Sequence, residues 1–279
     1  NITRIRIFTA LVSLLLSLQA VYFDDILNRD GLMYLQMVKA YLTGGLPAVQ
    51  AIYDWPAFSI LIAWIHQLTS LSIETTAFVL NSLFFILLTD ALLLISSLLV
   101  ASRRQLNIAA VLILCFMPIN EYRDFILRDP GYWAFSSLAL YQFMLFLNSS
   151  SYKTATLWQV FMVLAIFFRI EGSVVLLGLP LFLLFIRKPI EGLKQIIQAS
   201  YLLIISLVAI IGFVLSQPDL MAAFGKLSTI SLYLDLTKYT NTLTQYADVI
   251  KHQVLNRYSE GYAAFILITG MLAMLGYKI

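Results

Sequence analysis

Apolar runs separated by short polar stretches dominate the pattern along the chain. A helix needs about 20 mainly apolar residues to cross the hydrocarbon core of a membrane, with a range of roughly 17–25. Eight runs approach or reach this length, and we predict a membrane-spanning helix for each: residues 7–23, 76–99, 106–120, 132–147, 157–168, 173–186, 199–216 and 262–277. The pattern therefore predicts an all-α polytopic membrane protein with about eight transmembrane helices.

Two further segments are helix-like but shorter than a span. They are residues 31–43, which end at a pair of glycines, and residues 57–69, which follow a proline. About a dozen residues cannot cross a core that needs about 20, so we interpret both as amphipathic helices in the membrane interface. They belong to one long loop, residues 24–73, between the first and second predicted spans.

Composition supports a membrane protein. Hydrophobic residues make up 61% of the 279 residues and charged residues 12%, whereas a soluble domain carries about 25% charged residues. We interpret residues 1–279 as a single transmembrane domain. Because the chain begins with Asn1 and stops inside an apolar run, we expect a longer protein whose C-terminal part is missing here. The lone Cys115 forms no intrachain disulfide, and a net charge of +3 gives no sign of nucleic-acid binding.

The distribution of charge orients the predicted spans. Basic residues crowd the short loops on the side of the N-terminus, which the positive-inside rule makes cytoplasmic. These residues are Arg4, Arg6, Arg103, Arg104, Lys153, Arg187, Lys188, Lys194 and Lys278. Thirteen of the fifteen acidic residues fall on the outer side. Of the other two, Glu191 is on the inner side and Asp90 lies within a predicted span. We therefore predict an acidic working surface on the outer face.

Two acidic clusters lie on this outer side, because an even number of predicted crossings separates them. They are "DDILNRD" at residues 24–30 and "EYRDFILRDPGYW" at residues 121–133. Two carboxylates from different loops can divide labour, one abstracting a proton and the other holding a metal or an acceptor hydroxyl, while arginines bind a phosphate in bidentate fashion. These parts suit glycosyl transfer from a lipid phosphate.

The spacing of these residues resembles that of a known family. "RDGLMYLQMVKAYLTGG" resembles the Asp-x-x-x-Tyr pattern that follows the first span in membrane glycosyltransferases of the GT-C type, and "YDWPAFSILIAW" resembles their Tyr-x-x-Pro segment. "LRDPGYWAFSSLALYQFMLF" and "FFRIEGSVVLLGLPLFLLF" resemble the stretches that open their fourth and sixth spans. The resemblance covers roughly residues 5–190. This group uses polyprenyl-phosphate sugars and includes protein mannosyltransferases and lipid A aminoarabinose transferase.

The resemblance implies an inverting glycosyltransferase that moves a sugar from a polyprenyl-phosphate donor to a hydroxyl of a glycan, lipid or protein acceptor. It places the catalytic base at Asp30 and a second acidic residue at Asp129. Many relatives carry another acid directly after the base, but Gly31 stands there, so the partner acid is expected at Asp24 or Asp25. The expected ligands of the donor phosphate are Arg128, Arg123 and Arg169. A divalent cation, Mg²⁺ or Mn²⁺, would bind at Asp129, and the expected location is the bacterial inner membrane.

Structural explanations stay open beside these roles. Asp30 is also a suitable N-cap for a helix starting at Gly31, and Asp129 before a proline suits a helix start. The pair Asp24-Asp25 would also mark the exit of a span into water. Asp90, inside the second predicted span, needs an interhelical partner or a cavity. The alternative function is a transporter or flippase of lipid-linked sugars, for which Asp90 is the main indication; a noncatalytic membrane scaffold is a third interpretation.

Overall fold

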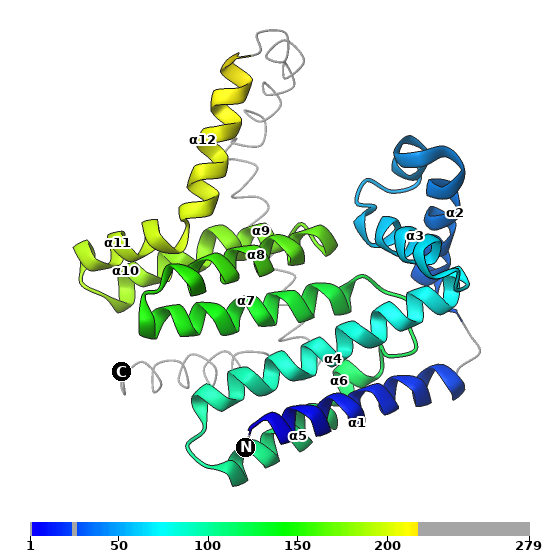
Figure 1. Cartoon of the computed structure of the whole chain (residues 1–279), viewed down its shortest axis with the longest axis horizontal. Coiled ribbons are helices and arrows are strands. Elements are labelled where there is room, and N and C mark those ends of the chain that lie inside the picture. The colour runs from blue at the N-terminus through cyan, green and yellow to red at the C-terminus, as the bar shows by residue number, and fades with distance from the viewer. Residues whose placement is uncertain (1, 24–26, 217–279) are drawn as a thin grey trace, which may run out of the picture. The chain divides into compact units, whose positions relative to one another are not determined.

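The computed structural model describes residues 2–23 and 27–216, and every regular element in these ranges is a helix (Figure 1). Asp24, Asp25 and the predicted span 262–277 lie outside the described residues. The helices are α1 (Ile2–Phe23), α2 (Arg29–Gln50), α3 (Ala57–Thr69), α4 (Ile73–Leu99), α5 (Arg103–Leu114), α6 (Met117–Asn120), α7 (Asp129–Ser149), α8 (Tyr152–Phe168), α9 (Gly172–Gly178), the 3-10 helix η1 (Leu179–Phe182), α10 (Leu183–Ile186), α11 (Pro189–Ala199) and α12 (Tyr201–Ser216).

The long helices pack in chain order. The chain divides into two compact units, and the first unit ends at Leu207. In this unit α1 packs on α4, α4 on α7 and α7 on α8. The helices α2 and α3 pack on each other and on α4, beside the end of α1 and the start of α4 (Figure 1). The long loop between the first two long helices is thus folded into a separate helical pair.

The two shorter helices predicted in this loop are present. α3 has the predicted bounds, whereas α2 begins at Arg29, two residues before the predicted start, and extends to Gln50. Asn28 therefore occupies the N-cap position, and Asp30 lies in the first turn. The N-cap explanation for Asp30 is wrong, although an acid in the first turn still interacts favourably with the helix dipole. The helix is kinked at Gly45, whose φ of 66° is the left-handed conformation that favours glycine.

Two helices, α1 and α4, are long and apolar enough to cross a membrane, and they cover the predicted spans 7–23 and 76–99. A third is reached if α11 and Tyr201–Ala209, which are bent by 59°, form one span. In the part of the chain that the structure describes, this is fewer than the eight spans predicted. α7 and α8 cover the segments 132–147 and 157–168 as unbroken helices of 21 and 17 residues, but neither is both long and apolar enough.

The predicted spans 106–120 and 173–186 each contain a proline, and each differs from a regular α-helix there. Segment 106–120 divides between α5, which ends at Leu114, and the short α6, which has Pro118 in its first turn. Segment 173–186 stays helical from Gly172 to Ile186, but the 3-10 helix η1, with Pro180 in its first turn, stands between α9 and α10. Proline has no N–H to donate, so the regular α-helical hydrogen bonding is interrupted at both positions.

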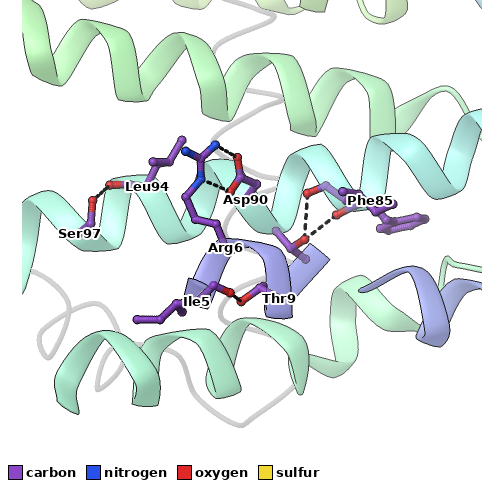
Figure 2. A network of polar contacts seen from close by, with 9 residues as sticks. Ile5, Arg6, Thr9, Phe85, Asp90, Leu94 and Ser97 are labelled. Carbon is purple, nitrogen blue, oxygen red and sulfur yellow. Dashed lines mark hydrogen bonds and ion pairs between the residues drawn. The ribbon is translucent and has the colours of Figure 1, made fainter. Parts of the chain in front are cut away.

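An ion pair joins the first two long helices. Arg6 on α1 donates from Nε and Nη2 to the two carboxylate oxygens of Asp90 on α4, each at 2.7 Å. Figure 2 shows the two side chains meeting between the helices. Bidentate pairing is the strongest geometry available to arginine and a carboxylate. The prediction that Asp90 has an interhelical partner is confirmed.

Candidate functional site

The loop 121–128 leads into α7 and lies directly against the first turn of α2. Asn28 Oδ1 accepts a hydrogen bond from the Ile126 N–H at 3.0 Å, and Asn81 Nδ2 donates to the Phe125 carbonyl at 2.6 Å. The approach is close at Gly31, where a Cβ would lie 2.5 Å from Asn28 Oδ1 and 3.1 Å from Ile126 Cβ. Gly31 therefore allows α2 to contact the loop that carries Arg128.

Arg123 is buried in the same loop and is only 2% exposed. Its guanidinium donates to Asn120 Oδ1 at 2.8 Å, to the Ser13 carbonyl at 2.9 Å and to Ser17 Oγ at 2.7 Å. It also lies 4.7 Å from the centre of the Phe85 ring. Burial lowers its pKa to about 10, which still leaves it charged at neutral pH. Its donors are engaged by neutral oxygens, so the geometry gives Arg123 the role of fixing the loop to α1.

Arg128, five positions later, has a different environment. It is partly exposed, and its guanidinium lies 5.1 Å from the centre of the Tyr53 ring. In the described part of the chain it makes no ion pair. The guanidinium of Arg128 is available to an anionic ligand.

The position of Tyr53 follows from its neighbour Trp55, in the turn between α2 and α3. Trp55 Nε1 donates to the carbonyls of Ile166 and Phe167, at 3.1 and 2.9 Å. These carbonyls belong to the last turn of α8, which leaves some of its carbonyls without helical partners. The α2–α3 turn is thereby attached beside Arg169, which follows α8.

Arg169 binds two carboxylates. It donates to Glu171 Oε1 at 2.9 Å and to Asp129 Oδ1, and it lies 5.9 Å from the centre of the Tyr132 ring. The hydrogen bond from Arg169 lowers the pKa of Glu171 below the ordinary glutamate value. α7 starts at Asp129, as expected for an acid before a proline, but Arg128 and not Asp129 occupies the N-cap position. Its carboxylate instead joins the start of α7 to the end of α8.

Tyr34 on α2 lies among these charged groups. Its side chain is buried, at 4% exposure, and burial raises its pKa to about 12; Asp129 and Asp30 add to the rise, and Arg128 opposes it. The hydroxyl is therefore protonated at neutral pH and is a hydrogen-bond donor. Asp30 is exposed at the start of the same helix. Tyr34 therefore lies one helical turn after Asp30 on α2, and the start of α2 lies against the loop that leads to Asp129.

An apolar cavity of about 660 Å³ lies between the α2–α3 pair and the long helices. It is within the size range of small-molecule binding pockets, roughly 300–1,000 Å³. Trp64 Nε1 donates to the Tyr41 hydroxyl at 3.0 Å, which joins α3 to α2 in the cavity wall. The other lining residues are Leu46, Ala57, Ile60, Leu61, Phe84, Phe135, Leu164, Phe167 and Phe168. Phe168, at the end of α8, lines the cavity and directly precedes Arg169 in the sequence.

The donor set does not fit the divalent cation considered for Asp129. Within residues 2–23 and 27–216, no three histidine, cysteine or acidic side chains lie close enough together to hold a metal ion. The Asp129 carboxylate is bound by Arg169, and a cation beside that guanidinium would be repelled. The residues around Asp129 therefore do not form a site for Mg²⁺ or Mn²⁺.

Of the predicted site residues, Asp129 and Arg169 form an ion pair, Arg128 directly precedes Asp129, and Asp30 lies in the first turn of α2, which starts against the loop 121–128. Arg123 lies apart in its buried network, and Asp24 and Asp25 lie outside the described residues. Tyr34 matched the Asp-x-x-x-Tyr pattern of the sequence but was given no role, and Tyr53 and Glu171 were not singled out for the site. No protein-family model, curated protein or solved structure matches the chain.

Proposed function

We propose that the protein is a polytopic membrane glycosyltransferase that moves a sugar from a polyprenyl-phosphate donor to an acceptor hydroxyl at the outer membrane surface. One arrangement supports the proposal: an apolar cavity of about 660 Å³ is lined by Phe168, and the next residue, Arg169, is paired with Asp129, beside Arg128, which makes no ion pair within the described residues. A lipid phosphate sugar needs these two environments side by side, one for its chain and one for its charged head.

The donor would bind with its prenyl chain in the apolar cavity and its phosphate at Arg128. Charge builds on the phosphate oxygen as the bond to the sugar breaks, and a preorganised guanidinium meets this charge with little reorganisation. The Arg128 guanidinium lies over the Tyr53 ring, and its planar fork can bind a phosphate in bidentate fashion. Arg169 adds positive charge nearby, although its two carboxylate partners already use part of its donor capacity.

Asp30 would act as the general base. Its carboxylate takes the proton of the acceptor hydroxyl while the oxygen attacks the anomeric carbon, and the bond between that carbon and the phosphate oxygen breaks. The products are the glycosylated acceptor and the polyprenyl phosphate, with inversion at the anomeric carbon, as the GT-C resemblance implies. The protonated Tyr34 hydroxyl, one helical turn after Asp30, would orient the acceptor.

The proposal includes a multi-pass topology with a cytoplasmic N-terminus. The segment formed by α5 with α6 and the helix formed by α9, η1 and α10 would complete crossings beside α1, α4, α7 and α8. Non-helical backbone at membrane depth is tolerated where it is buried in protein. The hydrogen bonds of Arg123 to α1 bury the irregular segment after α6 in this way.

The transporter or flippase interpretation receives less support. It relied on Asp90 as an ionisable group facing a transport path. Asp90 instead accepts hydrogen bonds from two nitrogen atoms of Arg6, Nε and Nη2, so its charge is already paired within the protein.

Replacing Asp30 with Asn tests the proposal. We expect transfer from a polyprenyl-phosphate sugar to fall by about 10² to 10⁴, the usual contribution of a general base. Thermal stability should change little, because the lost helix-dipole interaction is worth about 0.3–1 kcal/mol. Glu74→Gln is the matched control, since Glu74 is also a first-turn acid, on α4. Full transfer activity in Asp30→Asn would remove Asp30 as the base.

A further inference from the structure

Helix α11 has no role in the proposed reaction, yet its position is strongly fixed. Figure 1 places it at the end of the first unit opposite α2 and α3. Gln195 Nε2 donates to Ser150 Oγ at 2.9 Å, and Trp158 Nε1 donates to the Ala199 carbonyl at 2.7 Å. A Cβ at Gly192 would lie 2.9 Å from the Leu183 carbonyl oxygen, so glycine allows α11 to pack closely on α10. α11 is therefore held against its neighbours along one side.

The opposite side of α11 is exposed and carries a stripe of apolar residues with charged residues along its edge. Ile190, Leu193 and Ile197 are 86%, 56% and 54% exposed, and their spacing of three and four residues forms one stripe. Lys194 and Glu191 are also exposed and lie along the edge of this stripe. An apolar stripe with a charged flank is the pattern of a helix that lies in the plane of a membrane surface.

The charges and the bend indicate which surface this is. In the segment 187–199, Arg187, Lys188 and Lys194 are basic and Glu191 is the one acid. Arg187 donates to the Leu147 carbonyl at 2.8 Å, which leaves the two lysines for an outside partner. α11 meets Tyr201–Ala209 at 59°, as expected where a helix in the membrane plane continues into one that leaves it. Anionic headgroups attract basic residues, and lysine stems extend along apolar surface.

We propose that α11 is an in-plane membrane anchor at the end of the protein opposite Asp30. Its stripe of Ile190, Leu193 and Ile197 inserts below the phosphate level, and Lys188 and Lys194 bind anionic phospholipid headgroups. This inference goes beyond the proposed glycosyl transfer and does not depend on it. The same pair of elements is then an interfacial helix followed by a separate helix, and not a single broken span.

The depth of the stripe is measurable on the full chain in nanodiscs. In a Cys115→Ser background, Leu193→Cys carries a nitroxide, and its accessibility to oxygen and to a water-soluble nickel chelate gives its depth. We expect a position roughly 5–10 Å below the phosphates. A probe at the bilayer centre would show a broken span, and a fully water-exposed probe would show a free face or a protein-binding face. Either result overturns the proposal.

Lipid selectivity tests the lysines. Spin-labelled phosphatidylglycerol and phosphatidylcholine give the relative association constant of the protein for anionic lipid. We expect Lys188→Gln with Lys194→Gln to lower this constant by about fivefold per lysine, which corresponds to about 1 kcal/mol for each basic residue near the surface. Lys153→Gln, an exposed lysine on α8, is the matched control and should have a smaller effect. An unchanged constant in the double variant would exclude anionic lipid as the ligand of α11.

Discussion

Two arginines in one loop, Arg123 and Arg128, differ in what their guanidinium groups contact. Arg123 is buried and donates to four oxygens of its own protein, from α1 and the end of α6. Arg128 is partly exposed and lies over a tyrosine ring, without an ion pair in the described residues. The comparison shows that the donors still available, and not the charge alone, decide whether an arginine can bind a ligand.

Arg169 falls between these two cases. It is partly exposed like Arg128, but two carboxylates hold it. Its net contribution to an incoming phosphate is therefore reduced by the negative charge of Asp129 and Glu171. This ranks the three arginines for phosphate binding, with Arg128 first, Arg169 second and Arg123 last. Substitutions can test the ranking.

The largest effect is expected at Arg128. Arg128→Gln should lower kcat/KM for transfer by about 10² to 10³, because a lost electrostatic donor to a developing charge costs that much, while the unfolding temperature stays near that of the wild type. Arg128→Lys should recover part of this loss, since it keeps the charge but loses the planar fork. Arg29→Gln, an exposed arginine at the start of α2, is the control. Undiminished transfer in Arg128→Gln would show that Arg128 does not bind the donor phosphate.

Arg123 should show the opposite behaviour. Arg123→Met should lower the free energy of unfolding by about 2–3 kcal/mol, because several charge-assisted hydrogen bonds are lost and serine hydroxyls are left buried. Chemical denaturation in detergent measures this. Transfer per folded molecule should change far less than in Arg128→Gln. If instead Arg123→Met keeps full stability and loses transfer, the buried arginine acts in the reaction and the distinction fails.

A smaller effect is expected at Gly31, which sets the distance between α2 and the loop of both arginines. Gly31→Ala places a Cβ against Asn28 and Ile126 and should destabilise the protein by about 1 kcal/mol, at the low end for overpacking. Gly178→Ala is the control, because a Cβ there meets nothing within 4 Å. Stability equal in the two variants would show that the close approach of α2 to the loop is not required.

The smallest effect concerns Glu171 and pH. Arg169 lowers the pKa of Glu171, so the stabilising contribution of this pair is present above the ordinary glutamate pKa and is lost as pH falls through the lowered value. The pair is partly exposed, so Glu171→Gln should cost only a few tenths of a kcal/mol at neutral pH. The difference in unfolding temperature between wild type and variant should shrink at acid pH. A difference that grows in acid would contradict this assignment.

Local pattern was sufficient to predict the elements near the site. The bounds of α3 and the presence of α2 followed from apolar spacing and flanking glycine and proline, because these signals act within one helix. The need of Asp90 for a partner followed from its position in an apolar helix. Each of these predictions depended on a few neighbouring residues.

Long-range contacts explain what the sequence did not predict. Arg123, Arg128 and Arg169 look alike in the sequence, and only the placement of α1, Tyr53 and Asp129 distinguishes them. Pro118 and Pro180 were visible, but the apolar composition around them favoured continuous spans. The sequence predicts an inner loop for the residues of α11, because Arg187, Lys188 and Lys194 are basic. The spacing of Ile190, Leu193 and Ile197 by three and four residues is the signal that indicates an amphipathic helix there.

The ion pair between Arg6 and Asp90 also bears on how the chain is inserted during synthesis. An aspartate near the centre of an inserting helix costs about 2.5–3.5 kcal/mol, and its partner arginine was synthesised 84 positions earlier. The cost of inserting α4 is therefore reduced if α1 is still close by when α4 enters the bilayer. If α1 assists α4 in this way, mutating Arg6 should lower the membrane integration of α4, independently of the proposed transfer reaction.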